Sequence, residues 1–253
     1  MRDTSVMVCG SPAEIAERAL DLLVDGLRAG VRERGSAHLA LTGGSSASAL
    51  FTLLRDDPRA ARVEWSHVHV WQGDERFVPL DHPDRNWAVA LREWLAVDGG
   101  PGAVLHPIPV DEAIAGGHDA AWAAARYAEE IEAALPRRDD TPSFDVLLLG
   151  VGPDGHILST FPGTAPTEET RVPVLSVAAP VEVEPHVARV TLAPFLLAAA
   201  RVIVVMVPGA GKRDVVAECF QTPLDLTRLP AQAAIRPNAV WLLEPDSASR
   251  SIA

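Results

Sequence analysis

The sequence predicts an α/β protein, with a mainly parallel sheet covered by helices on both faces and folded as a single domain over residues 1–253. Two observations support this fold class. The runs Val146–Leu149 and Val202–Val207 lack polar alternation, as expected for strands buried on both faces. Strand-like and helix-like segments also alternate along the chain without an internal repeat or a low-complexity linker. This pattern is typical of a doubly wound, three-layer αβα domain.

The composition narrows the class of protein. With 34 acidic and 22 basic residues, the net charge of −12 disfavours nucleic acid or a membrane surface as a partner. Only Cys9 and Cys219 are present, so we expect neither a disulfide framework nor a metal site. The first residues do not resemble a secretion signal, and no apolar run approaches the roughly 20 residues of a membrane span. We therefore expect a cytoplasmic protein, and the sequence leaves its oligomeric state open.

The first half of the chain shows the expected alternation. Ser11, Pro12 and Glu14 form a helix start, with an N-cap, a proline in the first turn and an acidic third position. The patterns that follow predict, in order, a helix over 12–30, a strand over 37–41, a helix over 47–56, a strand over 67–71, a helix over 86–95, a loop over 98–117 and a helix over 118–135.

A glycine-rich loop joins the strand at 37–41 to the next helix. Its residues Thr42, Gly43, Gly44 and Ser45 would present backbone N–H groups to an anion at the positive end of the helix dipole. A tight turn followed by a serine N-cap explains the same residues equally well. These residues alone therefore leave open whether the loop binds an anion or is a simple turn.

Three charged residues, Asp74, Glu75 and Arg76, follow the strand at 67–71. The ends of strands in α/β sheets are half-buried, and an unpaired charge there costs free energy. A solvated loop is the simpler explanation when these residues are considered alone. Their position directly after a buried strand favours a functional role.

Two glycine patterns in the second half resemble nucleotide-binding motifs. Gly150–Gly155 matches G-x-G-x-x-G, but Pro162 follows too soon for the helix that would hold a pyrophosphate. The segment after the strand at 202–207 has Met206 and Arg213 where a P-loop needs glycine and a hydroxyl residue. Neither is a nucleotide site, although Lys212 remains a point charge for one phosphate. The remaining expectations are a substrate-side flap over 164–188, strands over 189–192 and 239–243, and a helix over 213–220.

His156 is the candidate base. A lone histidine is more often structural, but this one follows a glycine turn after the most apolar strand, with Asp154 two residues before it. An imidazole in that place is suited to accept a proton from water near neutral pH. The loops at 42–45 and 74–76, together with His156 and Lys212, all follow predicted strands, and Arg189 starts one. They would converge on a sugar-phosphate-sized pocket that needs neither a metal nor an organic cofactor.

The chain resembles the 6-phosphogluconolactonases from about Val8 to Leu243, on the segments LTGGSS, WQGDERFVPLDHPDRN, GVGPDGHILSTFPG, RVTL and PGAGK. This family is related to the glucosamine-6-phosphate deaminases and shares their three-layer fold. The resemblance implies that a small sugar-phosphate lactone is hydrolysed in the oxidative pentose phosphate pathway. It implies that His156 is the general base, that Asp74 and Asp154 shape the site, and that the substrate is held by Arg76, Arg189 and Lys212.

The sequence departs from the family at one place and leaves two alternatives open. Ile157 and Leu158 stand where the family pattern has small residues after the histidine. The first alternative is an amino-sugar phosphate deaminase or isomerase, in which a tyrosine usually stands at the position of Arg76. The second is a non-catalytic sugar-phosphate sensor domain, but no basic helix-turn-helix segment precedes residue 30.

Overall fold

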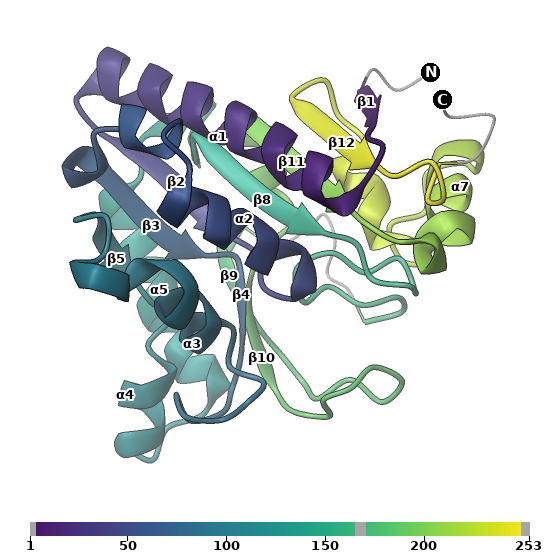
Figure 1. Cartoon of the computed structure of the whole chain (residues 1–253). Coiled ribbons are helices and arrows are strands. Elements are labelled where there is room, and N and C mark those ends of the chain that lie inside the picture. Colours follow the sequence, from purple (N-terminus) through teal and green to yellow (C-terminus); the bar gives the residue numbers. More distant parts are fainter. Residues whose placement is uncertain (1–3, 165–170, 249–253) are drawn as a thin grey trace.

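A computed structural model describes residues 4–164 and 171–248, whose strands and helices alternate along most of the chain (Figure 1). The strands are β1 Ser5–Val8, β2 Ala37–Leu41, β3 Val68–Gln72, β4 Asp74–Arg76, β5 Val104–His106, β6 Arg137–Arg138, β7 Thr141–Pro142, β8 Val146–Gly150, β9 Val174–Val177, β10 Arg189–Leu192, β11 Val202–Val207 and β12 Ala239–Leu243. The helices are α1 Pro12–Arg34, α2 Ser45–Asp56, α3 Asn86–Ala90, α4 Val110–Ala115, α5 Ala120–Ala134, α6 Leu196–Ala199 and α7 Arg213–Gln221.

The main sheet of the described residues has seven strands in the order β1-β12-β11-β8-β2-β3-β5, and every neighbouring pair is parallel. From β2 the chain winds outward through β3 and β5, whereas β8 lies on the other side of β2 and is followed by β11 and β12. The strand order therefore reverses between β2 and β8. In such sheets a ligand binds in the crevice beyond the carboxyl ends of the two strands at the reversal.

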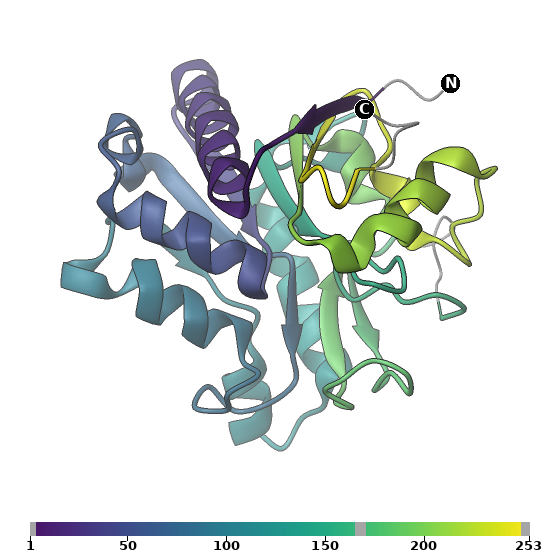
Figure 2. The same ribbon diagram turned by 45° about the vertical axis from the view of Figure 1, so that its right-hand side comes forward.

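Both faces of the main sheet are buried, which accounts for its unbroken apolar strands. In β8, Val146 and Leu148 join the core beneath α1 and α2, while Leu147 and Leu149 join the core beneath α5 and α7. Successive side chains of a strand point to opposite faces, so each face receives an apolar residue only if the whole strand is apolar. The prediction of a three-layer αβα architecture is confirmed (Figure 2).

A second, antiparallel sheet in the order β4-β10-β9 branches from the carboxyl end of β3 and packs against α5 (Figure 1). Its register places Arg189 opposite Arg76 and Thr191 opposite Asp74. Gly73 links the two sheets, because its N–H donates to the carbonyl of Leu41 and its carbonyl accepts from the N–H of Leu192. The small sheet thus brings β10, from the second half of the chain, to the carboxyl end of β3.

Several predicted elements need correction. The segment 98–117 is not only a loop, because it contains β5 and α4. The β5 strand is short and exposes Val104 and Leu105 at the edge of the sheet, so it carries little apolar signal. Asp74–Arg76 forms a strand of its own, and the helix expected over 86–95 continues from α3 as a π-helical turn over Leu91–Leu95.

Parts of two expectations reach beyond the described residues. Of the flap expected over 164–188, residues 165–170 lie outside them, and the described remainder contains β9. The expectation of one domain over residues 1–253 likewise stays a prediction. No helix in the described ranges is long and apolar enough to cross a membrane.

Candidate active site

A pocket of about 200 Å³ lies beyond the carboxyl ends of β2 and β8, at the point where the strand order reverses. It collects residues from the segments after β2 and β8, from strand β4, from the start of α3 and from the turn before α7. The lining residues are Thr42, Gly43, Gly44, Asp74, Arg76, Asn86, Gly150, Val151, Gly152, Pro153, His156, Leu158 and Lys212. Most of the predicted site residues thus meet in one cavity, although they come from distant parts of the chain.

His156 and Asp154 form a hydrogen-bonded pair in the turn after β8. The Nδ1 atom of His156 lies 2.5 Å from Oδ1 of Asp154, which also accepts the backbone N–H of His156 at 3.2 Å. Burial alone would raise the pKa of Asp154, but the hydrogen bond and the charge of His156 outweigh it and lower that pKa. Because the carboxylate engages Nδ1, the other ring nitrogen, Nε2, is left for a ligand.

Glycines make this turn possible. A Cβ on Gly152 would lie 2.1 Å from Nδ1 of His156, and Gly155 has a φ of 87°, a conformation that side chains with a Cβ rarely adopt. No helix begins between Gly150 and Gly163, so this segment lacks the helix that a dinucleotide-binding motif needs. The segment is a turn that carries the histidine.

The loop after β2 lines the pocket with Thr42, Gly43 and Gly44, directly before the start of α2. Gly44 stands at the N-cap position of α2 with a φ of 82°, and no side chain that the structure describes caps the helix. The first N–H groups of α2 are therefore not satisfied by a capping side chain. Ser45 is the first residue of α2, and its side chain is outside what the structure describes.

The three predicted cations occupy different positions. Arg76 and Lys212 line the pocket, and burial lowers the pKa of Lys212. Arg189 does not line it: the side chain is buried opposite Arg76, and its Nη2 donates to the carbonyl of Pro185 at 2.9 Å. Burial and the neighbouring charge of Arg76 lower the pKa of Arg189. The Nε atoms of both arginines are buried without a hydrogen-bond partner among the described residues.

The carboxylate of Asp74 is held in place from behind. Its Oδ2 accepts the hydroxyl hydrogen of Ser159 at 2.6 Å, and the N–H of Ser159 donates to Oγ1 of Thr191 at 3.1 Å. Thr191 lies opposite Asp74 in the small sheet. Two other segments, at Ser159 and Thr191, therefore hold this acidic side chain in the wall of the pocket.

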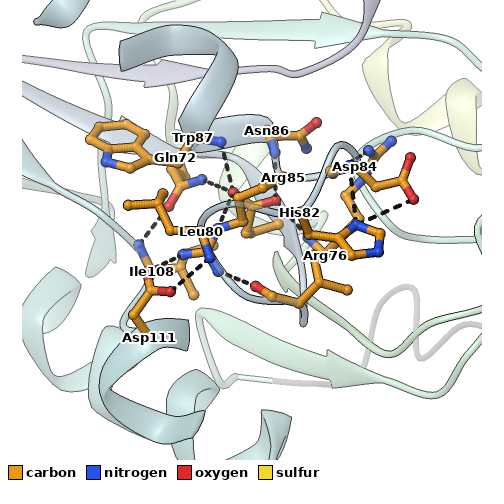
Figure 3. A network of polar contacts seen from close by, with 12 residues as sticks. Gln72, Arg76, Leu80, His82, Asp84, Arg85, Asn86, Trp87, Ile108 and Asp111 are labelled. Atoms are coloured by element: carbon orange, nitrogen blue, oxygen red, sulfur yellow. Dashed lines mark hydrogen bonds and ion pairs between the residues drawn. The ribbon is translucent and has the colours of Figure 1, made fainter. Parts of the chain in front are cut away.

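Glu75 does not face the pocket but supports it. It is fully buried, with Oε2 3.0 Å from Nε of Arg85, which is also fully buried. Its carboxylate accepts the backbone N–H groups of Arg76, Asn86 and Trp87 at 2.7, 2.9 and 2.8 Å. Figure 3 shows Arg76, Arg85, Asn86 and Trp87 in this network of polar contacts, and Arg85 reaches on to Asp111. The charge of Glu75, which would be costly if it were buried unpaired, is thus paired with that of Arg85. Through its hydrogen bonds the same carboxylate joins β4 to the start of α3.

Sequence reasoning missed Asn86 as a lining residue, and it left open the effect of Ile157 and Leu158 on the pocket. Asn86 is the first residue of α3, and its place at a helix start after the charged segment is the sequence signal that points to it. Of the two large residues after the histidine, Ile157 is buried in the core, whereas Leu158 lines the pocket with a φ of 53°. Ile157 therefore contributes to the core, and Leu158 places an apolar side chain in the lining of the pocket.

Within the described ranges, no group of three or more His, Cys, Asp or Glu side chains could hold a metal ion. Cys9 and Cys219 are both buried and unpaired, and burial raises the pKa of each thiol. The lining residues offer the imidazole of His156, the carboxylate of Asp74, two cations and backbone amides, and Asp154 contacts the imidazole without lining the pocket.

The parallel sheet, the pocket at its strand reversal and the histidine–carboxylate pair define an α/β protein with a polar site for a small anionic ligand. The family described as glucosamine-6-phosphate isomerases/6-phosphogluconolactonase matches residues 10–242, so the chain belongs to this family. A 6-phosphogluconolactonase of Mycobacterium tuberculosis is 38% identical over 230 residues, which is 90% of each chain. One of Streptomyces coelicolor is 34% identical over 262 residues, 99% of this chain and 96% of the relative.

Solved structures support the same fold. The 6-phosphogluconolactonase of Leishmania guyanensis matches with a TM-score of 0.84 and 27% identity, covering 99% of both chains. That of Trypanosoma brucei matches with a TM-score of 0.83 and 26% identity over 98% of both. A monomeric glucosamine-6-phosphate deaminase matches at 0.72, with 17% identity over 96% of this chain and 98% of that one. This last likeness concerns the fold alone, and it agrees with the expected deaminase-like architecture.

Proposed function

We propose that the chain hydrolyses 6-phospho-D-glucono-1,5-lactone to 6-phospho-D-gluconate, as the names of its relatives state for those proteins. The observation that carries the proposal is the His156–Asp154 pair, whose histidine lines one pocket together with Arg76 and Lys212. This combination offers a base for water and two positive charges for a phosphate. A cytoplasmic location remains part of the proposal.

His156 accepts a proton from water through Nε2, because Nδ1 is engaged by Asp154. The water oxygen bonds to C1 of the lactone, and the carbonyl oxygen becomes an oxyanion that backbone N–H groups or a cation stabilise. Collapse of this intermediate breaks the bond from C1 to the ring oxygen. The proton on His156 then passes to the departing ring oxygen, which becomes the 5-hydroxyl group. A lactone is an activated ester, so this sequence requires no covalent enzyme intermediate.

The phosphate group of the substrate fits the cationic side of the pocket. Arg76 and Lys212 supply charge, and the loop of Gly43 and Gly44 supplies N–H groups at the start of α2. Arg189, behind Arg76, adds to the positive potential without lining the cavity. Binding energy from the phosphate, which is remote from C1, positions the carbonyl beside the water.

The decisive experiment follows lactone disappearance with and without the protein, and ammonia release from glucosamine 6-phosphate in parallel. We expect lactone hydrolysis well above the spontaneous rate and no ammonia. Ammonia release without an effect on the lactone would overturn the assignment in favour of a deaminase. No observation in the pocket favours a non-catalytic sensor, which would bind sugar phosphates without accelerating either reaction.

A further inference from the structure

The side chain of Asn86 lies against Gly43 in the pocket wall. A Cβ on Gly43 would be 2.2 Å from both Cγ and Oδ1 of Asn86, far inside the roughly 3.5 Å at which carbon atoms make contact. The φ of Gly43 is not in the left-handed region, so backbone conformation does not demand glycine here. What this glycine provides is the space that the amide of Asn86 occupies.

The backbone at Asn86 is held from beneath by Glu75. One carboxylate oxygen accepts the N–H of Asn86 and the other accepts the N–H of Trp87, so the first turn of α3 has a fixed orientation (Figure 3). Glu75 is itself fully buried and paired with Arg85. A buried, ion-paired carboxylate moves little, and it therefore sets where the Asn86 amide lies.

The amide keeps hydrogen-bonding capacity on the pocket side. Its Nδ2 donates to the carbonyl of Asp74 at a long 3.4 Å, and no other hydrogen bond to this amide is formed by the described residues. An asparagine amide has two N–H donors and one carbonyl acceptor. One donor and the acceptor therefore remain for a ligand, and a hydroxyl group, which both donates and accepts, complements them.

The other lining groups are suited to different parts of a substrate. Arg76 and Lys212 are charged and match a phosphate, while His156 is paired for proton transfer. Asn86 is a neutral group with both a donor and an acceptor on this wall. We propose that Asn86 is a specificity-determining residue that binds a ring hydroxyl of the phosphorylated lactone, and that Glu75 is its positioning residue. The inference rests on the proposed lactonase function.

The first test is the Asn86→Ala variant. Loss of a neutral hydrogen bond should raise KM for the lactone about 3- to 10-fold, with kcat within about 2-fold of the unmutated protein. Isothermal titration should show the same loss of affinity for 6-phosphogluconate. The affinity for inorganic phosphate should not change, because the cations are untouched. A general structural defect would weaken both ligands.

A double-mutant cycle tests the contact between the amide and the glycine. Gly43→Ala should reproduce the KM defect, because its Cβ displaces the amide. The Gly43→Ala/Asn86→Ala double variant should then be no worse than the larger single defect. Gly211→Ala is the matched control: its Cβ meets nothing within 4 Å, its φ is not positive, and it lies in the short 3-10 turn that follows β11. It should leave KM unchanged.

Each outcome decides one point. An Asn86→Ala variant with an unchanged KM, or with an equal loss of phosphate affinity, would overturn hydroxyl recognition. A loss confined to kcat would show that the amide acts on the reacting carbonyl instead. Additive defects in the double variant would overturn the contact with Gly43. Absence of lactone hydrolysis by the unmutated protein would overturn the proposed function itself, and that result is read before any variant is compared.

Discussion

Two histidines on neighbouring strands of the main sheet have opposite environments. His156 follows β8 in the pocket, with its side chain 21% exposed and hydrogen-bonded to Asp154. His38 lies within β2, is 3% exposed, accepts the Nε1–H of Trp71 at 3.2 Å and stacks on His69 with ring centroids 4.7 Å apart. Burial, followed by the charges of His69, His106 and Arg34, lowers the pKa of His38 to about 3.

The difference shows that position in the sheet decides what an imidazole can do. Within a strand that is buried on both faces, the charged form is desolvated, so His38 is a neutral packing residue. Beyond the end of a strand, a turn leaves one ring edge open and supplies a carboxylate for the other. We therefore expect substitutions at His156 and Asp154 to change the rate, and substitutions at His38 to change stability.

The largest expected effect is that of His156→Ala. Loss of the proposed general base should lower kcat for lactone hydrolysis by about 10²- to 10⁴-fold. The midpoint of thermal unfolding should change little, because the ring is partly exposed. Lactone disappearance corrected for the spontaneous rate measures the first quantity. A variant that keeps more than about a tenth of the activity would remove His156 from the mechanism.

Asp154→Asn should have the next largest effect. An amide can donate to Nδ1 and so favour the wrong tautomer, and we expect kcat to fall at least about 10-fold. The matched control is Asp214→Asn, which changes an exposed carboxylate in the first turn of α7 and should leave kcat within about 2-fold. Equal rates for the two variants would contradict the orienting role of Asp154.

His38→Ala should lower the stability of the fold and leave the rate unchanged, the opposite of what we expect for substitutions at His156 and Asp154. It removes a buried ring and leaves the indole N–H of Trp71 without its acceptor, at a cost of about 2 kcal/mol in the free energy of unfolding. Below the unfolding transition, kcat should equal that of the unmutated protein. Urea denaturation and steady-state rates on the same preparation measure both. A fall in kcat without a loss of stability would mean that the two histidines are not separate in function.

The smallest expected effect is a pH dependence of stability. In the folded state the pKa of His38 lies below its ordinary value of 6.5. Below pH 6.5 the unfolded chain therefore binds a proton at His38 that the folded protein does not bind. Stability is therefore lost as the pH falls from about 6.5 toward 3, and we expect His38 to contribute roughly 1–2 kcal/mol of loss between pH 7.5 and 5.0.

The His38→Phe variant isolates this contribution, because it keeps a stacked ring that cannot titrate. Urea denaturation at the two pH values should show a smaller loss for His38→Phe than for the unmutated protein. His69 Nδ1 lies 2.8 Å from His106 Nε2, and His106 Nδ1 lies 2.5 Å from Glu130, so part of the dependence will remain in the variant. Identical losses for both proteins would show that His38 titrates normally.

Much of the fold and the centre of the site were predictable. The unbroken apolar runs identified β8 and β11 as strands buried on both faces, and the turn from Gly150 to Gly155 identified the position of His156. Short or weakly apolar elements were not recognised. The sequence of the edge strand β5 resembles that of a loop, because three partly exposed residues between glycines and prolines carry no periodic pattern.

The sequence by itself determined the pairs that lie within one turn. His156 and Asp154 are two residues apart, and the backbone geometry of a glycine turn is enough to bring them together. Only the tertiary structure decided which distant residues meet. The register of β4 and β10 places Arg189 behind Arg76 and outside the cavity, and the buried Glu75–Arg85 pair aims Asn86 at Gly43. These contacts depend on strand pairing and core packing between remote segments, which no local pattern encodes.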